Sequence, residues 1–223
     1  MSRRKEEIIA FLEDKPGFAV EPIFTKPIKN LSESEFDLKR IQCLEVLAYL
    51  VKPHRLAHSV SVAELCAKVA RNNAERYALN VYEAYFAGLL HDCGKGLGKK
   101  KTVKLMKRYY PDYVNHACWT YHQFLGRLLT FRIFGVKEES ILDSVEYHAT
   151  GKKEMTCYQK LVYACDKIDP FRGYDSQYMI DAMMEDLDNG FRFVLSENLR
   201  YYGSKGFAVD DKFAADCFKY YLK

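Results

Sequence analysis

Six side chains with metal-binding chemistry stand at separate points along the sequence. They are four histidines and two aspartates, namely His58, His91, Asp92, His122, His148 and Asp166. Imidazole and carboxylate groups together suit borderline and hard divalent cations, with no need for a thiolate. Six ligands are too many for one tetrahedral zinc ion and about right for two cations that share a bridging carboxylate. The residue types therefore predict a two-metal centre.

The most informative segment is Leu89-Leu90-His91-Asp92-Cys93-Gly94-Lys95. An apolar helix end delivers His91 and Asp92, and their diverging side chains can serve two cations. Two cations roughly 3.5–4 Å apart hold a hydroxide and polarise a phosphoryl oxygen, as in-line attack on phosphorus requires. We therefore expect Asp92 and Lys95 to act in catalysis, with Lys95 near a phosphate. A phosphoenzyme on Cys93 is the alternative, but the sequence places no base beside this thiol.

Two further histidines need a separate interpretation. His54 lies one turn before His58 but follows Pro53 at a helix entrance, where exposure to solvent is the usual outcome. His116 competes with His122 for one ligand position, and spacing alone does not decide between them.

Helical periodicity dominates the chain, and no alternation typical of strands is sustained. After a short helix at 5–14, prolines and a glycine indicate an extended connector to about residue 33. Ser32 and Glu35 resemble a capping box that starts a helix running to Pro53. Further helices are expected at 55–78, 81–92, 99–109, 119–134, 138–148, 156–168, 175–202 and 210–221. The fold class is therefore predicted as all-α, a helical bundle.

The composition bounds the class of protein. A hydrophobic fraction of 48% in 223 residues supports one sizeable core, and a net charge of +4 does not by itself indicate nucleic-acid binding. Seven cysteines without a C-x-x-C pair argue against a disulfide framework or zinc finger, and favour buried thiols in a reducing compartment. The N-terminus contains no long apolar stretch, so a secretory signal or membrane span is not expected. The predicted location is the cytoplasm.

Taken in order, these segments resemble the HD superfamily, and within it the YqeK-like branch of symmetrical diadenosine tetraphosphate hydrolases. The resemblance covers about residues 40–222. It is carried by 55–62 around His58, 87–95 around His91-Asp92, His122 to Gly126, His148 to Gly151, and 162–172 around Asp166. The register of Gly126 and of 134–136 with the family pattern selects His122 over His116.

The resemblance implies a fold, a cofactor and a reaction. The fold would be an HD-domain bundle at 38–223, preceded by an N-terminal helical and extended arm at 1–37. The cofactor would be two metal ions, most often iron, with manganese, cobalt or zinc as alternatives. Asp92 would bridge the two ions, and the other five residues of the set would be ligands. A metal-bridging hydroxide would attack the middle of the tetraphosphate and release two ADP.

The resemblance also implies contacts with the substrate. Lys95 and Arg172 would lie near phosphate or ribose, although Arg172 has the alternative of fixing a turn by pairing with a carboxylate. Further contacts are assigned to Arg127, Thr150 and Gly151. Arg127 replaces a small residue of the family pattern, so it either crowds the pocket or contacts phosphate.

Three other positions depart from the family pattern. Ala149 stands in place of a threonine, Cys165 in place of an alanine, and Asp169 in place of a glutamate. These changes leave the six ligands intact and bear on the substrate.

The N-terminal arm is interpreted either as a docking helix or as the tail of a nicotinate-mononucleotide adenylyltransferase, a domain fused to some family members. A small nucleotide is the expected partner, without a membrane. A homodimer and a functional link to that adenylyltransferase are compatible with the resemblance.

Two other functions compete with this prediction. The first is another HD nucleotide phosphohydrolase, either a nucleoside monophosphate phosphatase or a guanosine polyphosphate hydrolase; such mononuclear relatives do not need His122 and His148. The second is a nucleotide- or RNA-binding module without turnover, which would use the lysine-rich segment 99–108 and stack bases on Tyr109 and Tyr110.

Overall fold

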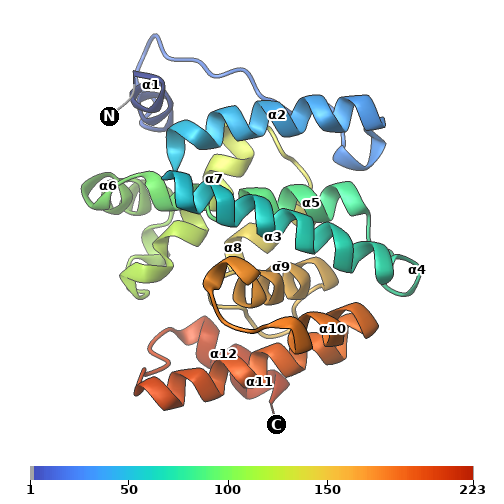
Figure 1. The fold of residues 1–223 in the computed structure, drawn as a ribbon. Coiled ribbons are helices and arrows are strands. Elements are labelled where there is room, and N and C mark those ends of the chain that lie inside the picture. The colour runs from blue at the N-terminus through green and yellow to red at the C-terminus, as the bar shows by residue number, and fades with distance from the viewer. Residues whose placement is uncertain (1–2, 223) are drawn as a thin grey trace.

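The computed structural model describes residues 3–222, and within this range it contains helices and no strand (Figure 1). The prediction of an all-α fold is confirmed. The helices are α1 (Arg3–Leu12), α2 (Glu33–Leu50), α3 (Pro53–Asn72), α4 (Ala74–Tyr77), α5 (Val81–Leu90), α6 (Lys99–Tyr109), α7 (Tyr121–Arg132), α8 (Glu139–Tyr147), α9 (Cys157–Ile168), α10 (Gln177–Glu185), α11 (Leu187–Lys205) and α12 (Lys212–Tyr221). Short 3-10 turns at Cys93–Gly96 (η2) and Pro170–Arg172 (η5) follow α5 and α9.

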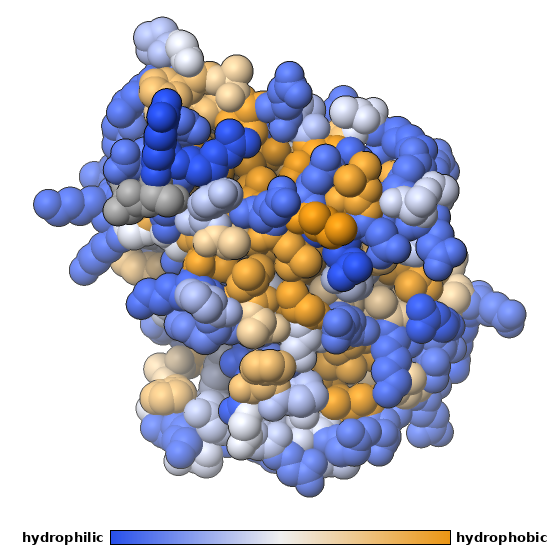
Figure 2. Space-filling model, turned by 45° about the horizontal axis from the view of Figure 1, so that its top comes forward, coloured by the Kyte–Doolittle hydropathy of each residue, from blue (hydrophilic) through white to orange (hydrophobic). Residues whose placement is uncertain are grey.

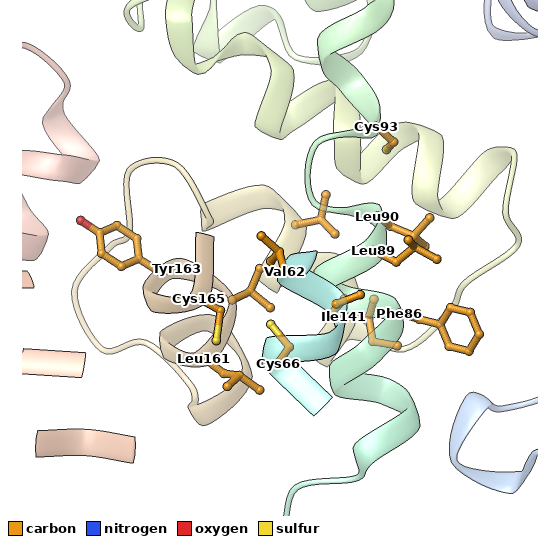
Figure 3. Close-up of a cluster of buried hydrophobic side chains, with 14 of the residues drawn as sticks. Val62, Cys66, Phe86, Leu89, Leu90, Cys93, Ile141, Leu161, Tyr163 and Cys165 are labelled. Atoms are coloured by element: carbon orange, nitrogen blue, oxygen red, sulfur yellow. The ribbon is translucent and has the colours of Figure 1, made fainter. Parts of the chain in front are cut away.

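The helices are stacked in layers, from α2 through α3 and α5 to α9 and then α11 (Figure 1). Helices α3 and α5 pack along one another in the middle, and α8 and α9 cover them. Figure 3 shows buried side chains of these four helices meeting in one cluster. Leu89 and Leu90, the two residues before His91, are fully buried there. Core packing therefore fixes the end of α5, where the candidate ligands begin.

Two helices begin with a complete capping box, in which side chain and backbone satisfy each other's free groups. At α2 the Ser32 hydroxyl accepts from the Glu35 amide, and the Glu35 carboxylate accepts from the Ser32 amide. The expected start of this helix is confirmed. Thr156 and Gln159 form the same arrangement at α9, and so define the start of the helix that carries Asp166.

Two helices predicted as continuous are interrupted. The run 55–78 breaks at Asn73, whose buried amide donates to the carbonyl oxygens of Val69 and Met183. The run 175–202 was predicted as one helix, and this is wrong. Asp186 is extended, and its carboxylate accepts from the Asn189 amide at the start of α11. Aspartate is a favoured N-cap residue, so the chain turns here and α10 and α11 form a hairpin.

The N-terminal arm packs against the rest of the chain. Ile8, Ile9 and Leu12 of α1 are buried within the same core as the later helices. The Lys5 ammonium donates to the Leu50 carbonyl oxygen at 2.9 Å, which ties α1 to the end of α2. In the connector, Phe24 packs edge-on against Phe86 of α5. These contacts favour the docking-helix interpretation, and position 37/38 falls inside α2 rather than at a break in the fold.

The regularly spaced apolar residues of α2 divide between the core and the surface. Leu47 and Leu50 are fully buried, whereas Leu38 and Ile41 are about half exposed at 52% and 49%. Figure 2 shows the face that carries α1 and α2, where apolar side chains reach the surface between charged ones. Within residues 3–222, no helix has the length and apolar character needed to cross a membrane.

Candidate metal centre

Helix ends position all six candidate ligands. His58 lies in the second turn of α3, His91 and Asp92 follow the last residue of α5, and His122 lies in the first turn of α7. The remaining two, His148 and Asp166, are at the C-terminal ends of α8 and α9. Helix ends converge here because the helices that carry them pack together, which brings residues 108 positions apart in sequence into contact.

Two glycines permit the close approach of the helices that carry the ligands. A Cβ atom on Gly88 of α5 would lie 2.8 Å from the Ala63 Cα atom of α3, closer than packed atoms allow. A Cβ atom on Gly94 would lie 2.2 Å from the His122 carbonyl oxygen. The absence of a side chain at these two positions therefore sets how near His58 and His122 lie to the His91-Asp92 pair.

The structure brings the six residues together in three overlapping groups, each with ligand atoms within 4.8 Å of one another. The groups are His58, His91 and Asp92; His91, His148 and Asp166; and Asp92, His122 and His148. Asp92 belongs to the first and the third group, and its Oδ1 atom lies 3.3–3.6 Å from the Nε2 atoms of His91, His122 and His148. This position suits a carboxylate that serves two cations.

Three of the histidines are oriented by one local arrangement. In His91, His122 and His148, Nδ1 lies 2.6–2.7 Å from the backbone carbonyl oxygen three residues earlier. A carbonyl oxygen only accepts, so Nδ1 carries the proton and Nε2 presents its lone pair to the cluster when the ring is neutral. In His58 the partner of Nδ1 is the Asp169 carboxylate at 2.5 Å. All four imidazoles therefore present Nε2 to the same space.

The arrangement of these lone pairs fits a bound cation. Within residues 3–222, the buried His91 Nε2 atom has no hydrogen-bond partner, an uncommon and costly state for a polar atom. The Nε2 atoms of His122 and His148 lie 3.1 Å apart, although both rings donate through Nδ1. A divalent cation satisfies several such lone pairs at once, so the donor set suits a metal.

Four basic side chains surround the two carboxylates. Lys95 lies 2.9 Å and Arg55 3.4 Å from Asp92. Lys167 lies 2.8 Å and Arg172 2.5 Å from Asp166. Each carboxylate thus has two cationic neighbours, which favour an anionic ligand beside the cluster.

The surroundings hold most of the ligands in the protonation state that binds metal. Burial lowers the pKa of His148 to about 4 and also lowers that of His122, so both rings are neutral. Burial opposes ionisation of Asp92 and Asp166, but neighbouring histidines and lysines outweigh it and keep each pKa well below its ordinary value. His58 differs. Burial again opposes its charge, yet hydrogen bonds to Asp166 and Asp169 raise its pKa to about 9.

Comparison with known families identifies the domain. The family model described as HD domain matches residues 55–170, more than half of the chain and the segment from His58 to Asp166. The chain belongs to the HD domain family. A solved structure from Clostridium acetobutylicum, described as a predicted HD superfamily hydrolase involved in NAD metabolism, superimposes with a TM-score of 0.72 at 22% identity. It covers 82% of this chain and 96% of its own, which establishes the likeness of fold.

Curated relatives share the same region of this HD-domain protein. The symmetrical bis(5'-nucleosyl)-tetraphosphatase of Bacillus subtilis (strain 168) is 27% identical over 172 residues, which span 72% of this chain and 90% of that protein. Its namesake from Staphylococcus aureus is also 27% identical, over 75% of this chain and 86% of its own. A Mycoplasma genitalium protein named probable nicotinate-nucleotide adenylyltransferase/Ap4A hydrolase is 26% identical over 58% of this chain and 36% of its length.

The candidate substrate residues of this HD domain lie in different settings. Lys95 and Arg172 contact the cluster carboxylates as described. Arg127 is surrounded by acidic groups, with Asp143 at 2.6 Å, Glu139 at 2.5 Å and Glu146 at 3.1 Å. Its charge is compensated there, which does not favour a phosphate contact.

Thr150 and Gly151 follow His148 in the chain and contact α7 and α12. Thr150 is buried and shares hydrogen bonds with the Gln123 side chain. Gly151 has a φ of +66°, and a Cβ atom there would lie 2.6 Å from the Cys217 Sγ atom. Both residues therefore join α7 and α12 to the end of α8 and hold the His148 backbone.

Sequence reasoning missed four residues around the cluster. Asp169 accepts from His58 and, at 2.5 Å, from the Ser61 hydroxyl. Arg55 and Lys167 contact the ligand carboxylates. A spacing signal was present, since Arg55 and Ser61 lie one helical turn on either side of His58. Asp169 was noted only as a departure from the family pattern, and its role depends on a contact between α3 and the end of α9.

The residues set aside by sequence reasoning lie outside the cluster. His54 is exposed, and His116 pairs with Asp211 at 2.8 Å and stacks on Phe213. Cys93 is fully buried, and burial raises the pKa of its thiol to about 12, so it is not a nucleophile at neutral pH. The described cysteines are free, and only Cys118 is exposed.

The N-terminal arm forms ion pairs and a hydrogen bond with the lysine-rich helix α6. Lys104 pairs with Glu13 at 2.8 Å, and Arg108 contacts Asp14. The Tyr109 hydroxyl contacts the Leu12 carbonyl oxygen at 2.7 Å, and the Tyr110 ring packs on Phe124. The two tyrosines expected to stack on bases are thus engaged within the protein, which counts against the nucleic-acid-binding alternative.

Proposed function

We propose that this HD-domain protein hydrolyses a dinucleoside tetraphosphate, such as diadenosine tetraphosphate, symmetrically to two ADP. The observation that carries the proposal is the pair of ligand groups that share Asp92, with four basic side chains around them. The names of three curated relatives, all symmetrical bis(5'-nucleosyl)-tetraphosphatases of 26–27% identity, support the same substrate.

The cofactor would be two metal ions, most often iron, with manganese, cobalt or zinc as alternatives. His58, His91, Asp92 and Asp166 would hold one ion, and Asp92, His122 and His148 the other. When bound, two such ions supply Lewis-acid activation of water and of a phosphoryl oxygen. The buried Asp92 would be shared because its Oδ1 atom faces histidines of both groups.

Basic side chains would bind and neutralise the polyphosphate. Lys95 and Arg55 on one side, and Lys167 and Arg172 on the other, already lie within 2.5–3.4 Å of the ligand carboxylates. With cations bound to those carboxylates, the same ammonium and guanidinium groups become available to phosphate oxygens. They would also stabilise negative charge on the departing ADP. No side-chain nucleophile is required, since Cys93 is buried in its neutral form.

The test is an assay of purified protein with dinucleoside polyphosphates, with metal content measured on the same sample. We expect diadenosine tetraphosphate to give ADP alone, and about two metal ions per chain. His91→Ala and Asp92→Ala should abolish hydrolysis while circular dichroism retains the helical signal. His54→Ala is the matched control, because His54 is exposed and lies one turn from His58.

Other products would identify a different reaction. AMP with ATP as products would mean asymmetric cleavage and would contradict the proposal, as would full activity of either ligand variant. One metal per chain with turnover of a nucleoside monophosphate would indicate a mononuclear phosphatase instead. The functional link to a nicotinate-mononucleotide adenylyltransferase stays a prediction, which the name of the Mycoplasma genitalium relative supports.

A further inference from the structure

A cavity of about 590 Å³ lies beside the metal cluster, and no step proposed above uses it. Its walls are the end of α9, the segment after η5, the start of α10 and the C-terminal half of α11. Sites for small molecules commonly enclose about 300–1,000 Å³, so the space is large enough for a nucleoside.

Two side chains connect this cavity to the cluster. Lys167 and Arg172 line the cavity, and both also contact the Asp166 carboxylate, at 2.8 Å and 2.5 Å. A group in the cavity and a phosphate at the cluster would therefore be separated by one layer of basic side chains. This arrangement matches a nucleotide, whose base and ribose would lie in the cavity while its phosphates extend past the basic side chains to the cluster.

Three tyrosine rings give the cavity a surface suited to a flat aromatic group. Tyr174, Tyr178 and Tyr201 line it and are 46%, 48% and 52% exposed. Neighbouring contacts hold two of these rings in place: the Tyr174 hydroxyl donates to the Lys167 carbonyl oxygen, and Tyr178 packs edge-on against Phe193. Exposed rings held in this way are ready to stack on a base, because stacking requires little further ordering.

One acidic group adds polarity to the same wall. Glu197 lines the cavity and pairs with Arg200 at 2.5 Å. Arg200 contacts the Oε1 atom, so the Oε2 atom of this carboxylate can accept a hydrogen bond from a base that carries an exocyclic amino group.

We propose that the cavity binds one nucleoside of the substrate, with the base against the tyrosine rings and its phosphates reached by Lys167 and Arg172. The base that fits the Glu197 carboxylate carries an amino group, as adenine does. This inference rests on the proposed function, because a dinucleotide held at the cluster must place a nucleoside beside it.

The experiment measures equilibrium binding to the metal-loaded protein by titration calorimetry, with ADP and inorganic pyrophosphate as the two probes. ADP should bind more tightly than pyrophosphate, which has no base. Tyr178→Ala and Tyr201→Ala should each weaken ADP binding roughly 5- to 150-fold, the range of one base–aromatic stack. Pyrophosphate binding should not change in these variants. Tyr49→Ala is the control, since Tyr49 is 46% exposed on α2 and does not line the cavity.

A second pair of probes tests the amino group. Glu197→Gln should reduce the preference for ADP over UDP, because uracil has no exocyclic amino group. Equal binding of ADP and pyrophosphate by the unmodified protein would overturn the inference. So would ADP binding that is unaffected in both tyrosine variants.

These outcomes are separate from failure of the proposed function. If the metal-loaded protein hydrolyses no dinucleoside tetraphosphate, that function fails, while ADP binding still decides whether the cavity holds a nucleoside. If the protein hydrolyses diadenosine tetraphosphate and Tyr178→Ala and Tyr201→Ala leave KM unchanged, the cavity assignment alone fails.

Discussion

At the scale of single residues, the cluster depends on where each imidazole proton is held. Three of the rings donate Nδ1–H to the backbone carbonyl oxygen three residues earlier, so local backbone geometry sets their orientation. His58 instead depends on Asp169, which is fully buried and is itself bonded to Ser61. A carboxylate partner of this kind fixes the tautomer of a ligating histidine and raises its basicity.

Asp169→Asn should therefore weaken metal binding and lower activity by about 10- to 100-fold, the usual effect of removing such a partner. Asn retains the size of the side chain, so the helical signal should stay unchanged. Metal affinity by titration and kcat by product analysis are the measurements. The matched control is Asp216→Asn, a partly exposed aspartate of α12 that pairs with Lys212. Equal losses in both variants would mean that Asp169 has no specific role.

The protonation of His58 predicts that metal binding depends on pH. Its pKa is raised to about 9 in the metal-free protein, so at pH 7 the ring is charged and Nε2 has no lone pair to give. A metal ion must displace that proton, and its apparent affinity should rise up to about tenfold per pH unit and level off above about pH 9.

Calorimetry with Mn²⁺ at pH 7, in two buffers of different ionisation enthalpy, should report the release of about one proton per chain from His58, in addition to any proton lost by metal-bound water. His148 and His122 contribute none, because their pKa values are lowered. No proton release at pH 7 would contradict a charged His58 in the metal-free state.

At the scale of elements, the centre depends on how closely the helices pack. Leu89 and Leu90 anchor the end of α5 in the core, and Gly88 lets α3 approach its backbone. Both features lie in the last turn of α5, directly before the His91-Asp92 pair, so packing between α3 and α5 determines the distance from His58 to that pair. The break at Asp186 acts similarly, because it folds α11 back alongside α10 and so provides two walls of the proposed nucleoside cavity.

Gly88→Ala should lower the free energy of unfolding by about 1–3 kcal/mol, the usual cost of overpacking a filled core. The added Cβ meets the Ala63 backbone, which cannot yield as a flexible side chain would. Gly203→Ala is the matched control, since Gly203 also lies in a helix but a Cβ atom there meets nothing within 4 Å. That substitution should stabilise the protein by roughly 0.5–1 kcal/mol. Urea unfolding followed by circular dichroism measures both, and equal shifts of the same sign would exclude a special packing role for Gly88.

At the scale of the whole molecule, the N-terminal arm belongs to the same folded unit as the HD domain. Ile8, Ile9 and Leu12 are buried in the common core. Asp14 also contacts Arg132 of α7 at 2.7 Å. Removal of the arm would expose the core side chains that it covers, so the arm contributes to the stability of the folded protein.

Ile9→Ala should therefore destabilise the whole protein by about 2–5 kcal/mol, within a single cooperative transition. Phe18→Ala in the exposed connector is the comparison, with an expected loss below about 1 kcal/mol. Thermal unfolding monitored at separate wavelengths for helix content and for aromatic environment would reveal either one transition or two. An early, separate transition for the Ile9 variant, with the main one unshifted, would mean that the arm folds independently.

The amino-acid sequence was enough to predict the fold class, most of the helices and, with the family resemblance to choose His122 over His116, the six candidate ligands. Apolar periodicity and capping residues act over one or two helical turns, so their effects can be read locally; the capping box at Ser32 is an example. The ligand set could also be recognised, because the short motifs around these residues match the family pattern in order along the chain.

The side chains that surround those candidate ligands became clear only from the packed helices. Three features join residues from different helices. They are the contact of Asp169 with His58, the ion pairs of Arg127 with three carboxylates, and the cavity beside Arg172. Such contacts depend on the angles and spacings of packed helices, which no local pattern encodes. The break at Asp186 was missed for the same reason. The buried Asn73 side chain, more than a hundred residues earlier, donates to the Met183 carbonyl oxygen and accepts from the Leu187 amide on either side of this break.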